Sequence, residues 1–73
     1  MGSKVRLTPG DVRAERGRHV PTVTQEVLAK ELGWHEPTLV DLELGRVDAT
    51  QEQLQAMLDA ITRIVARREE GVK

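Results

Sequence analysis

Hydrophobic residues recur at helical spacing in four stretches of the chain, and nowhere do they alternate with polar residues as they do along a half-buried β-strand. The last stretch is the longest, and its apolar side chains follow one another at intervals of one or three residues: Leu54, Met57, Leu58, Ile61, Ile64 and Val65. The pattern predicts an all-α domain of four helices, in which the fourth helix is much longer than the others.

Capping residues and glycines mark the ends of these helices. Thr8, Thr24 and Thr50 each precede an apolar-periodic stretch, and threonine is a favoured N-cap because its hydroxyl accepts a hydrogen bond from a free amide of the first turn. Gly33 and Gly45 follow the second and third stretches, where glycine is the usual helix stop. The predicted helices cover about residues 9–16, 25–32, 36–44 and 50–69.

The chain is long enough for one domain and no more, since it has 73 residues. We expect this domain to span residues 8–69, after an N-terminal arm of residues 1–7 and before a tail of residues 70–73. The chain has no cysteine, which excludes disulfides and thiolate metal sites. It has no signal peptide and no apolar run of membrane-spanning length, so a cytoplasmic protein is the default expectation.

Catalytic and metal-binding patterns are missing from the sequence. There is no nucleophile beside a base and no phosphate-cradling glycine loop. The two histidines, His19 and His35, lie far apart in sequence and make a poor metal site. We therefore expect a protein that is not an enzyme and that holds no metal or cofactor.

Charge is distributed unevenly, although the net charge is only −1. Residues 1–23 carry five lysines and arginines against two carboxylates, whereas residues 24–46 carry two against five. The first third of the chain is therefore basic and the middle is acidic, which matters for any polyanionic partner.

The second and third predicted helices are short and are joined by a glycine-containing turn, the arrangement of a helix-turn-helix motif. The residues in and around this motif resemble the lambda-repressor-like (Cro/repressor, Xre-type) DNA-binding family. The resemblance covers about residues 7–61, with the motif itself at residues 24–45. It rests on Arg13, Arg16, Gly17, Thr24, Gln25, Leu28, Ala29, Leu32, Gly33, Pro37, Thr38, Leu39, Leu42, Glu43 and Gly45.

This resemblance implies a four-helix lambda-repressor-like fold and a small, phage- or plasmid-type transcriptional regulator. Such a protein binds double-stranded DNA as a homodimer at the nucleoid, with its third helix in the major groove. The residues that would contact bases are Glu36, Pro37, Thr38, Val40 and Asp41. Those that would contact phosphates are Thr24, Gln25, Arg46, Arg16 and Arg18, with help from Lys4 and Arg6 in the arm.

Two further roles follow from the resemblance and from the long last helix. Glu43 is expected to pair with Arg13, the arginine four residues before Gly17, and so to orient the third helix on the first. Ile64 and Val65 lie beyond the usual end of the compact fold. We expect them to form the dimer contact, because exposed apolar side chains on a last helix usually have a partner.

The sequence departs from the family pattern in the loop before the second helix. Residues 18–23, RHVPTV, occupy a place where the family usually has a single apolar residue, and Val23 is expected to take that role. The extra residues make either a longer surface loop or a further phosphate contact through Arg18 or His19.

The third helix is also more acidic than is usual in the family. A carboxylate on Glu36 or Asp41 could accept a hydrogen bond from cytosine N4, but it would also repel DNA phosphates. Trp34, in the turn, either covers the core between two helices or is exposed as an anchor for a protein partner. An alternative function therefore stays open, in which the module no longer binds DNA. It would instead bind a protein through its acidic third helix and Trp34, as an anti-repressor or host-takeover protein could.

Overall fold

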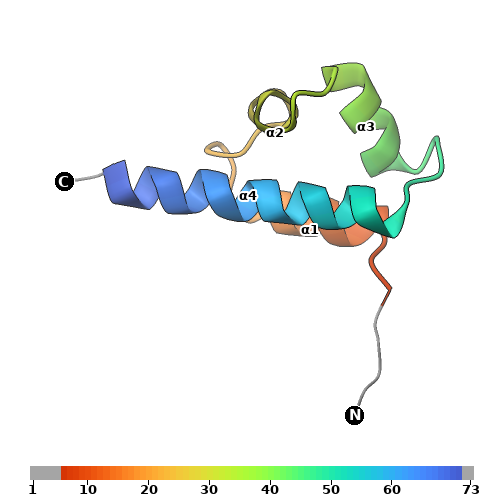
Figure 1. Cartoon of the computed structure of the whole chain (residues 1–73), viewed down its shortest axis with the longest axis horizontal. Coiled ribbons are helices and arrows are strands. Elements are labelled where there is room, and N and C mark those ends of the chain that lie inside the picture. The colour runs from red at the N-terminus through yellow and green to blue at the C-terminus, as the bar shows by residue number, and fades with distance from the viewer. Residues whose placement is uncertain (1–5, 72–73) are drawn as a thin grey trace, which may run out of the picture.

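The computed structural model describes residues 6–71, and their side chains as far as residue 69. It is all-α over this range, which confirms the predicted fold class. The four helices are α1 (Pro9–Gly17), α2 (Gln25–Leu32), α3 (Glu36–Leu44) and α4 (Gln51–Gly71). α1 and α4 lie side by side, α2 and α3 form a second layer above them, and the C-terminal half of α4 extends past α1 (Figure 1).

α1, α2 and α4 begin where the sequence predicts because side-chain hydrogen bonds hold their first turns. Thr8 Oγ1 accepts the Asp11 amide at 3.1 Å, and the Asp11 carboxylate accepts the Thr8 amide at 3.0 Å. Thr50 and Gln53 form the same reciprocal pair at the start of α4. Thr24 caps α2. A capping residue of this kind contributes about 1 kcal/mol to helix stability.

Glycines in the left-handed conformation end the two short helices of the upper layer. Gly33 has a φ of 73° and Gly45 a φ of 74°, which few other residues adopt without strain. At Gly33 the chain turns so that the Trp34 amide donates to the Ala29 carbonyl at 2.9 Å. α3 can therefore begin with only three residues between it and the end of α2.

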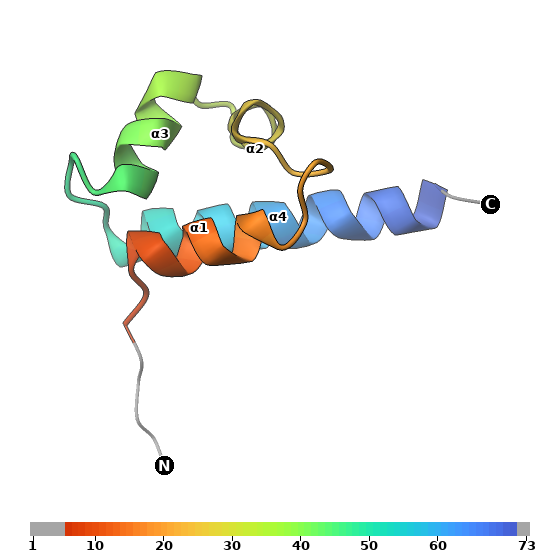
Figure 2. The same cartoon turned by 180° about the vertical axis from the view of Figure 1, so that it is seen from behind.

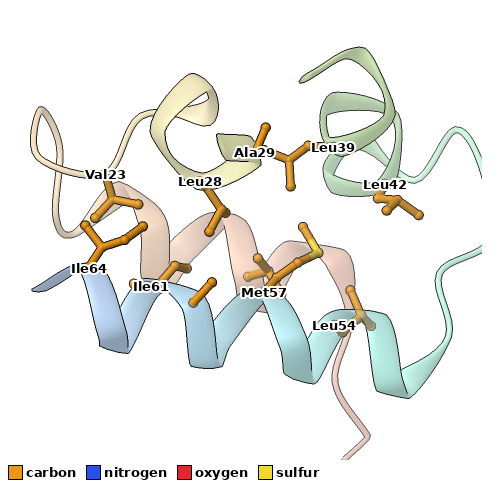
Figure 3. Packing of buried hydrophobic residues seen from close by; sticks show 11 residues of the cluster. Val23, Leu28, Ala29, Leu39, Leu42, Leu54, Met57, Ile61 and Ile64 are labelled. Atoms are coloured by element: carbon orange, nitrogen blue, oxygen red, sulfur yellow. The ribbon is translucent and has the colours of Figure 1, made fainter. Parts of the chain in front are cut away.

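The core lies between the two layers and consists of aliphatic side chains from all four helices. Met57 and Ile61 of α4 point toward Leu28 of α2, and α3 adds Leu39 (Figure 3). Burial of such a side chain contributes about 1.5–3 kcal/mol. Trp34 is partly buried and packs against this cluster, which agrees with the first of its two alternative roles. The buried members are Val12, Val23, Leu28, Ala29, Leu39, Leu42, Leu54, Met57, Ala60, Ile61 and Ile64.

The loop of residues 18–23 is folded onto the end of α4, and this corrects the role expected of Ile64. Val23 is fully buried and takes the apolar place predicted for it, and Ile64 points toward it at one end of the core (Figure 3). Ile64 is only 8% exposed, so it is a core residue and is not available for a dimer contact. Val65, beside it, is only partly buried.

Hydrogen bonds to α4 fix the segment that precedes α1. The Leu7 amide donates to Gln51 Oε1, and Gln51 Nε2 donates back to the Leu7 carbonyl, both at 2.8 Å. Residues 6–8 consequently leave the body on the side of α1 and α4 that faces away from α2 and α3 (Figure 1). None of the helices in the described range is long and apolar enough to cross a membrane.

Candidate nucleic-acid interface

The first turn of α3 is exposed at the surface of the molecule. It lies on the side of the upper layer that is farthest from α1 and α4 (Figure 2). Glu36, Pro37 and Thr38 are exposed there, whereas Leu39 and Leu42 point inward and are buried. The helix is thus anchored by one face and presents the other to solvent, as insertion into a DNA groove requires.

The five residues predicted to contact bases are all on this helix, but they are not equally accessible. The three in the first turn are exposed, while Val40 and Asp41, one turn further on, are partly buried. His35 is the N-cap residue of α3 and makes no side-chain capping bond. The amides of the first turn are therefore left without a side-chain acceptor from the N-cap.

Glu43, on the inner side of α3, joins three helices through one carboxylate. Its side chain is fully buried and accepts two hydrogen bonds from Arg16 of α1, from Nε at 2.7 Å and from Nη2 at 3.0 Å. Gln25 Nε2 of α2 donates to the same carboxylate at 3.1 Å. Bidentate arginine–carboxylate pairs combine strength with a defined geometry, so this network sets how α3 lies on α1 and α2.

This network corrects the ion pair expected from the resemblance. The partner of Glu43 is Arg16, and Arg13 is exposed on the surface of α1. Arg16 follows the buried Val12 by four residues, so both share the face of α1 that meets α3. The arginine four residues before Gly17 was the wrong choice, because its side chain is exposed and does not share the face of α1 that meets α3.

Arg16 and Gln25 consequently differ from the exposed phosphate contacts that the resemblance implies. The Arg16 side chain is only 15% exposed and both residues donate to Glu43. Thr24 likewise uses its hydroxyl to cap α2. The amide end of α2 lies beside these residues and favours anions in its own right.

Arg46 stands just past the C-terminal end of α3 and faces a carboxylate of the same helix. Its Nη1 lies 3.4 Å from Asp41 Oδ1, and the two side chains are 66% and 40% exposed. An exposed ion pair of this kind contributes at most about 1 kcal/mol, because water and salt screen it. Arg46 is thus accessible, but part of its charge is neutralised within the protein.

The remaining predicted cations do not gather at α3. Arg18 belongs to the loop of residues 18–23, which runs on the opposite side of α2 from α3 (Figure 1). Its Nη1 lies 3.6 Å from Glu15 Oε1. His19 Nε2 lies 3.2 Å from the same carboxylate. Arg6 belongs to the segment that leaves on the far side of α1 and α4. Lys4 lies outside the described residues.

Lys30 is a cation near the first turn of α3 that the sequence alone did not single out. It is exposed on α2 and lines a shallow hollow with Trp34, His35 and Glu36. The hollow also includes Glu26, Ala29 and Gly33. Its position in the sequence could have indicated this place. Lys30 precedes Gly33 by three residues and so lies in the last turn of α2, and the turn after Gly33 leads to the start of α3.

Comparison with known proteins supports the motif that this geometry shows. A family model described as helix-turn-helix matches residues 22–62, which is more than half of the chain. No curated protein and no solved structure matches the chain.

Proposed function

Because the chain belongs to the helix-turn-helix family of DNA-binding, non-enzymatic domains, we propose that it is a sequence-specific transcriptional regulator that binds double-stranded DNA. The observation that carries the proposal is the exposed first turn of α3, on a helix whose inner face is held by the Glu43 network. A rigidly placed helix end with accessible side chains is what major-groove recognition needs.

In this proposal α3 reads bases and its surroundings bind phosphate. The carboxylates of Glu36 and Asp41 would accept hydrogen bonds from cytosine N4, and Pro37 and Val40 would contact thymine methyl groups. Thr38 can serve as donor or acceptor. The phosphate contacts would come from Thr24 with the amide end of α2, and from Lys30 and Arg46. Arg16 and Gln25 act as positioning residues through Glu43.

A second copy of the chain would give the regulator two reading helices. Val65 is only partly buried and lines a hollow at the end of α4 with Val20, which is 54% exposed. These apolar side chains support a homodimer contact at this end. A two-fold dimer of helix-turn-helix modules reads two half-sites about one helical turn of DNA apart.

Selection from a pool of random duplexes at low salt tests this function. We predict that the protein retains a subset of duplexes that share two inverted half-sites containing G·C pairs, because acidic side chains prefer cytosine. Trp34 is the only tryptophan of a chain without tyrosine or phenylalanine, and it lies in the turn before α3, so its fluorescence should change with binding. If no duplex is retained at low salt, the protein is not a DNA-binding regulator.

One observation favours a second function, in which the module binds a protein partner. Glu36 and Glu26 border the hollow at Trp34, and Asp41 neutralises part of the charge of Arg46. This face could therefore attract a basic protein. Under this alternative Glu36→Lys would abolish partner binding, whereas it would strengthen binding to random DNA if α3 faces phosphates.

A further inference from the structure

The pair formed by Asp41 and Arg46 connects two residues that the proposed function uses differently. Asp41 follows Pro37 and Thr38 by four and three residues, so it lies on the same side of α3 as the exposed first turn. Arg46 follows the chain reversal at Gly45, where its amide donates to the Asp41 carbonyl at 2.9 Å. The turn at Gly45 thus places the proposed base-reading carboxylate next to the proposed phosphate-binding guanidinium.

This pair is weak enough to open when DNA arrives. Its atoms are 3.4 Å apart, and both side chains are at least 40% exposed. The Arg16–Glu43 pair is different, because it is bidentate and its carboxylate is fully buried. Of these two pairs on α3, it is therefore the Asp41–Arg46 pair that can exchange its partner without disturbing the fold.

A carboxylate beside Arg46 also changes what that arginine contributes on DNA. The gain from a phosphate contact comes largely from the release of counterions by an unneutralised cation. While Arg46 stays with Asp41, part of its charge is already balanced and the gain from a phosphate contact is smaller. Arg46 contributes fully only when Asp41 has found another donor.

We propose that Asp41 is a specificity-determining residue that couples base reading to phosphate binding through Arg46. On a duplex that offers a cytosine N4 amino group to α3, the Asp41 carboxylate accepts a hydrogen bond from that base and releases Arg46 to a phosphate. On other sequences Asp41 keeps Arg46, and the complex loses both contacts together. This inference rests on the proposed function. The coupling weakens binding to non-specific DNA while Arg46 still contributes its phosphate contact at the correct site.

Salt-dependent binding of four variants tests the coupling: Asp41→Asn, Arg46→Ala, the double variant, and Asp48→Asn as a control. Asp48 is exposed in the loop after Arg46, so its replacement removes the same charge without releasing the arginine. Each protein is titrated into the selected duplex and into a random duplex pool at several salt concentrations. Circular dichroism first confirms that each variant is folded.

We expect Asp41→Asn to bind the random pool about fivefold to tenfold more tightly near 0.1 M salt, with a salt slope about 0.9 steeper, because one more phosphate is neutralised. Its preference for the selected duplex should fall at least about fivefold, since an amide donates as well as accepts. Arg46→Ala should flatten the slope by about 0.9 on the selected duplex and leave the random pool unchanged. The double variant should bind the random pool no more tightly than the unaltered protein does. Asp48→Asn should change neither the salt slope of binding nor the preference for the selected duplex.

Two results would overturn the inference while the proposed function stands. One is that Arg46→Ala flattens the slope equally on both duplexes. The other is that Asp41→Asn leaves the slope on the random pool as it was, or behaves like Asp48→Asn. Failure of the proposed function itself has a different signature, because then neither the unaltered protein nor Asp41→Asn retains any duplex at low salt, which overturns both.

Discussion

Glu43 is the residue on which the arrangement of the proposed interface depends most. Its carboxylate is buried, and it is acceptable there only because Arg16 and Gln25 supply three hydrogen bonds. Those bonds come from α1 and α2, so a single side chain of α3 fixes the position of the helix that we propose enters DNA.

Replacing Arg16 by methionine should therefore destabilise the protein by about 3 kcal/mol, because it leaves a buried carboxylate without its cation. The Arg13→Met variant is the matched control, since Arg13 is exposed on the same helix and its loss should change the free energy of unfolding by less than about 0.5 kcal/mol. Urea unfolding followed by circular dichroism measures both values. Equal effects of the two replacements would show that Arg16 does not hold Glu43.

Local features at the residue scale could be predicted from the sequence, whereas the pairing of Glu43 could not. Thr8, Thr24 and Thr50 cap helices through bonds to residues three positions away, so a short stretch of sequence contains all the information. Arg16 and Glu43 are 27 positions apart. Their pairing depends on how α1 packs against α3, which no short stretch of sequence specifies.

At the scale of elements, α2 and α4 are joined by an ion-pair cluster on the surface. Glu31 of α2 accepts hydrogen bonds from Arg63 at 3.0 Å and from Arg67 at 3.1 Å, both on α4. Hydrogen bonds from Arg67 and then Arg63 lower the pKa of Glu31 below its ordinary value of 4.5. The cluster links the last turns of α4 to the helix-turn-helix motif.

The lowered pKa makes a prediction about acid stability. A carboxyl group with a lower pKa in the folded state stabilises the fold above its unfolded value, and this contribution disappears as the pH falls through the folded-state pKa. Glu31→Gln should thus be less stable than the unaltered protein at pH 7. The difference should shrink as the pH falls below the ordinary pKa of 4.5, and it should vanish once the pH is below the lowered folded-state pKa and Glu31 is protonated.

Unfolding curves at pH 7 and pH 3 measure this difference, with Glu26→Gln as a control on the exposed face of the same helix. Added salt should reduce the effect at pH 7, because the pairs are exposed. A difference that is the same at both pH values would contradict the role given to Glu31. The sequence predicted the bounds of both helices from caps and periodicity, but not this cluster, since its members meet only after α2 has packed on α4.

At the scale of the whole molecule, the order and number of helices followed from hydrophobic periodicity, but the end of the core did not. Ile64 is buried because the inserted loop brings Val23 over the end of α4, and nothing in the periodicity of α4 indicates that cover. The positions of the charged side chains in space could likewise not be predicted from the sequence. The sequence shows how many arginines precede the motif, whereas the fold directs Arg18 toward Glu15 and away from α3.

The exposed first turn of α3 is the surface that we propose meets DNA. Amide nuclear magnetic resonance of the protein titrated with its selected duplex examines this surface directly. We predict the largest chemical-shift changes at residue 36, at residues 38–41 and at the start of α2, residues 24 and 25. The outer face of α4, at Thr62 and Ala66, should change little. The largest changes along α4, with the first turn of α3 unaffected, would contradict the account.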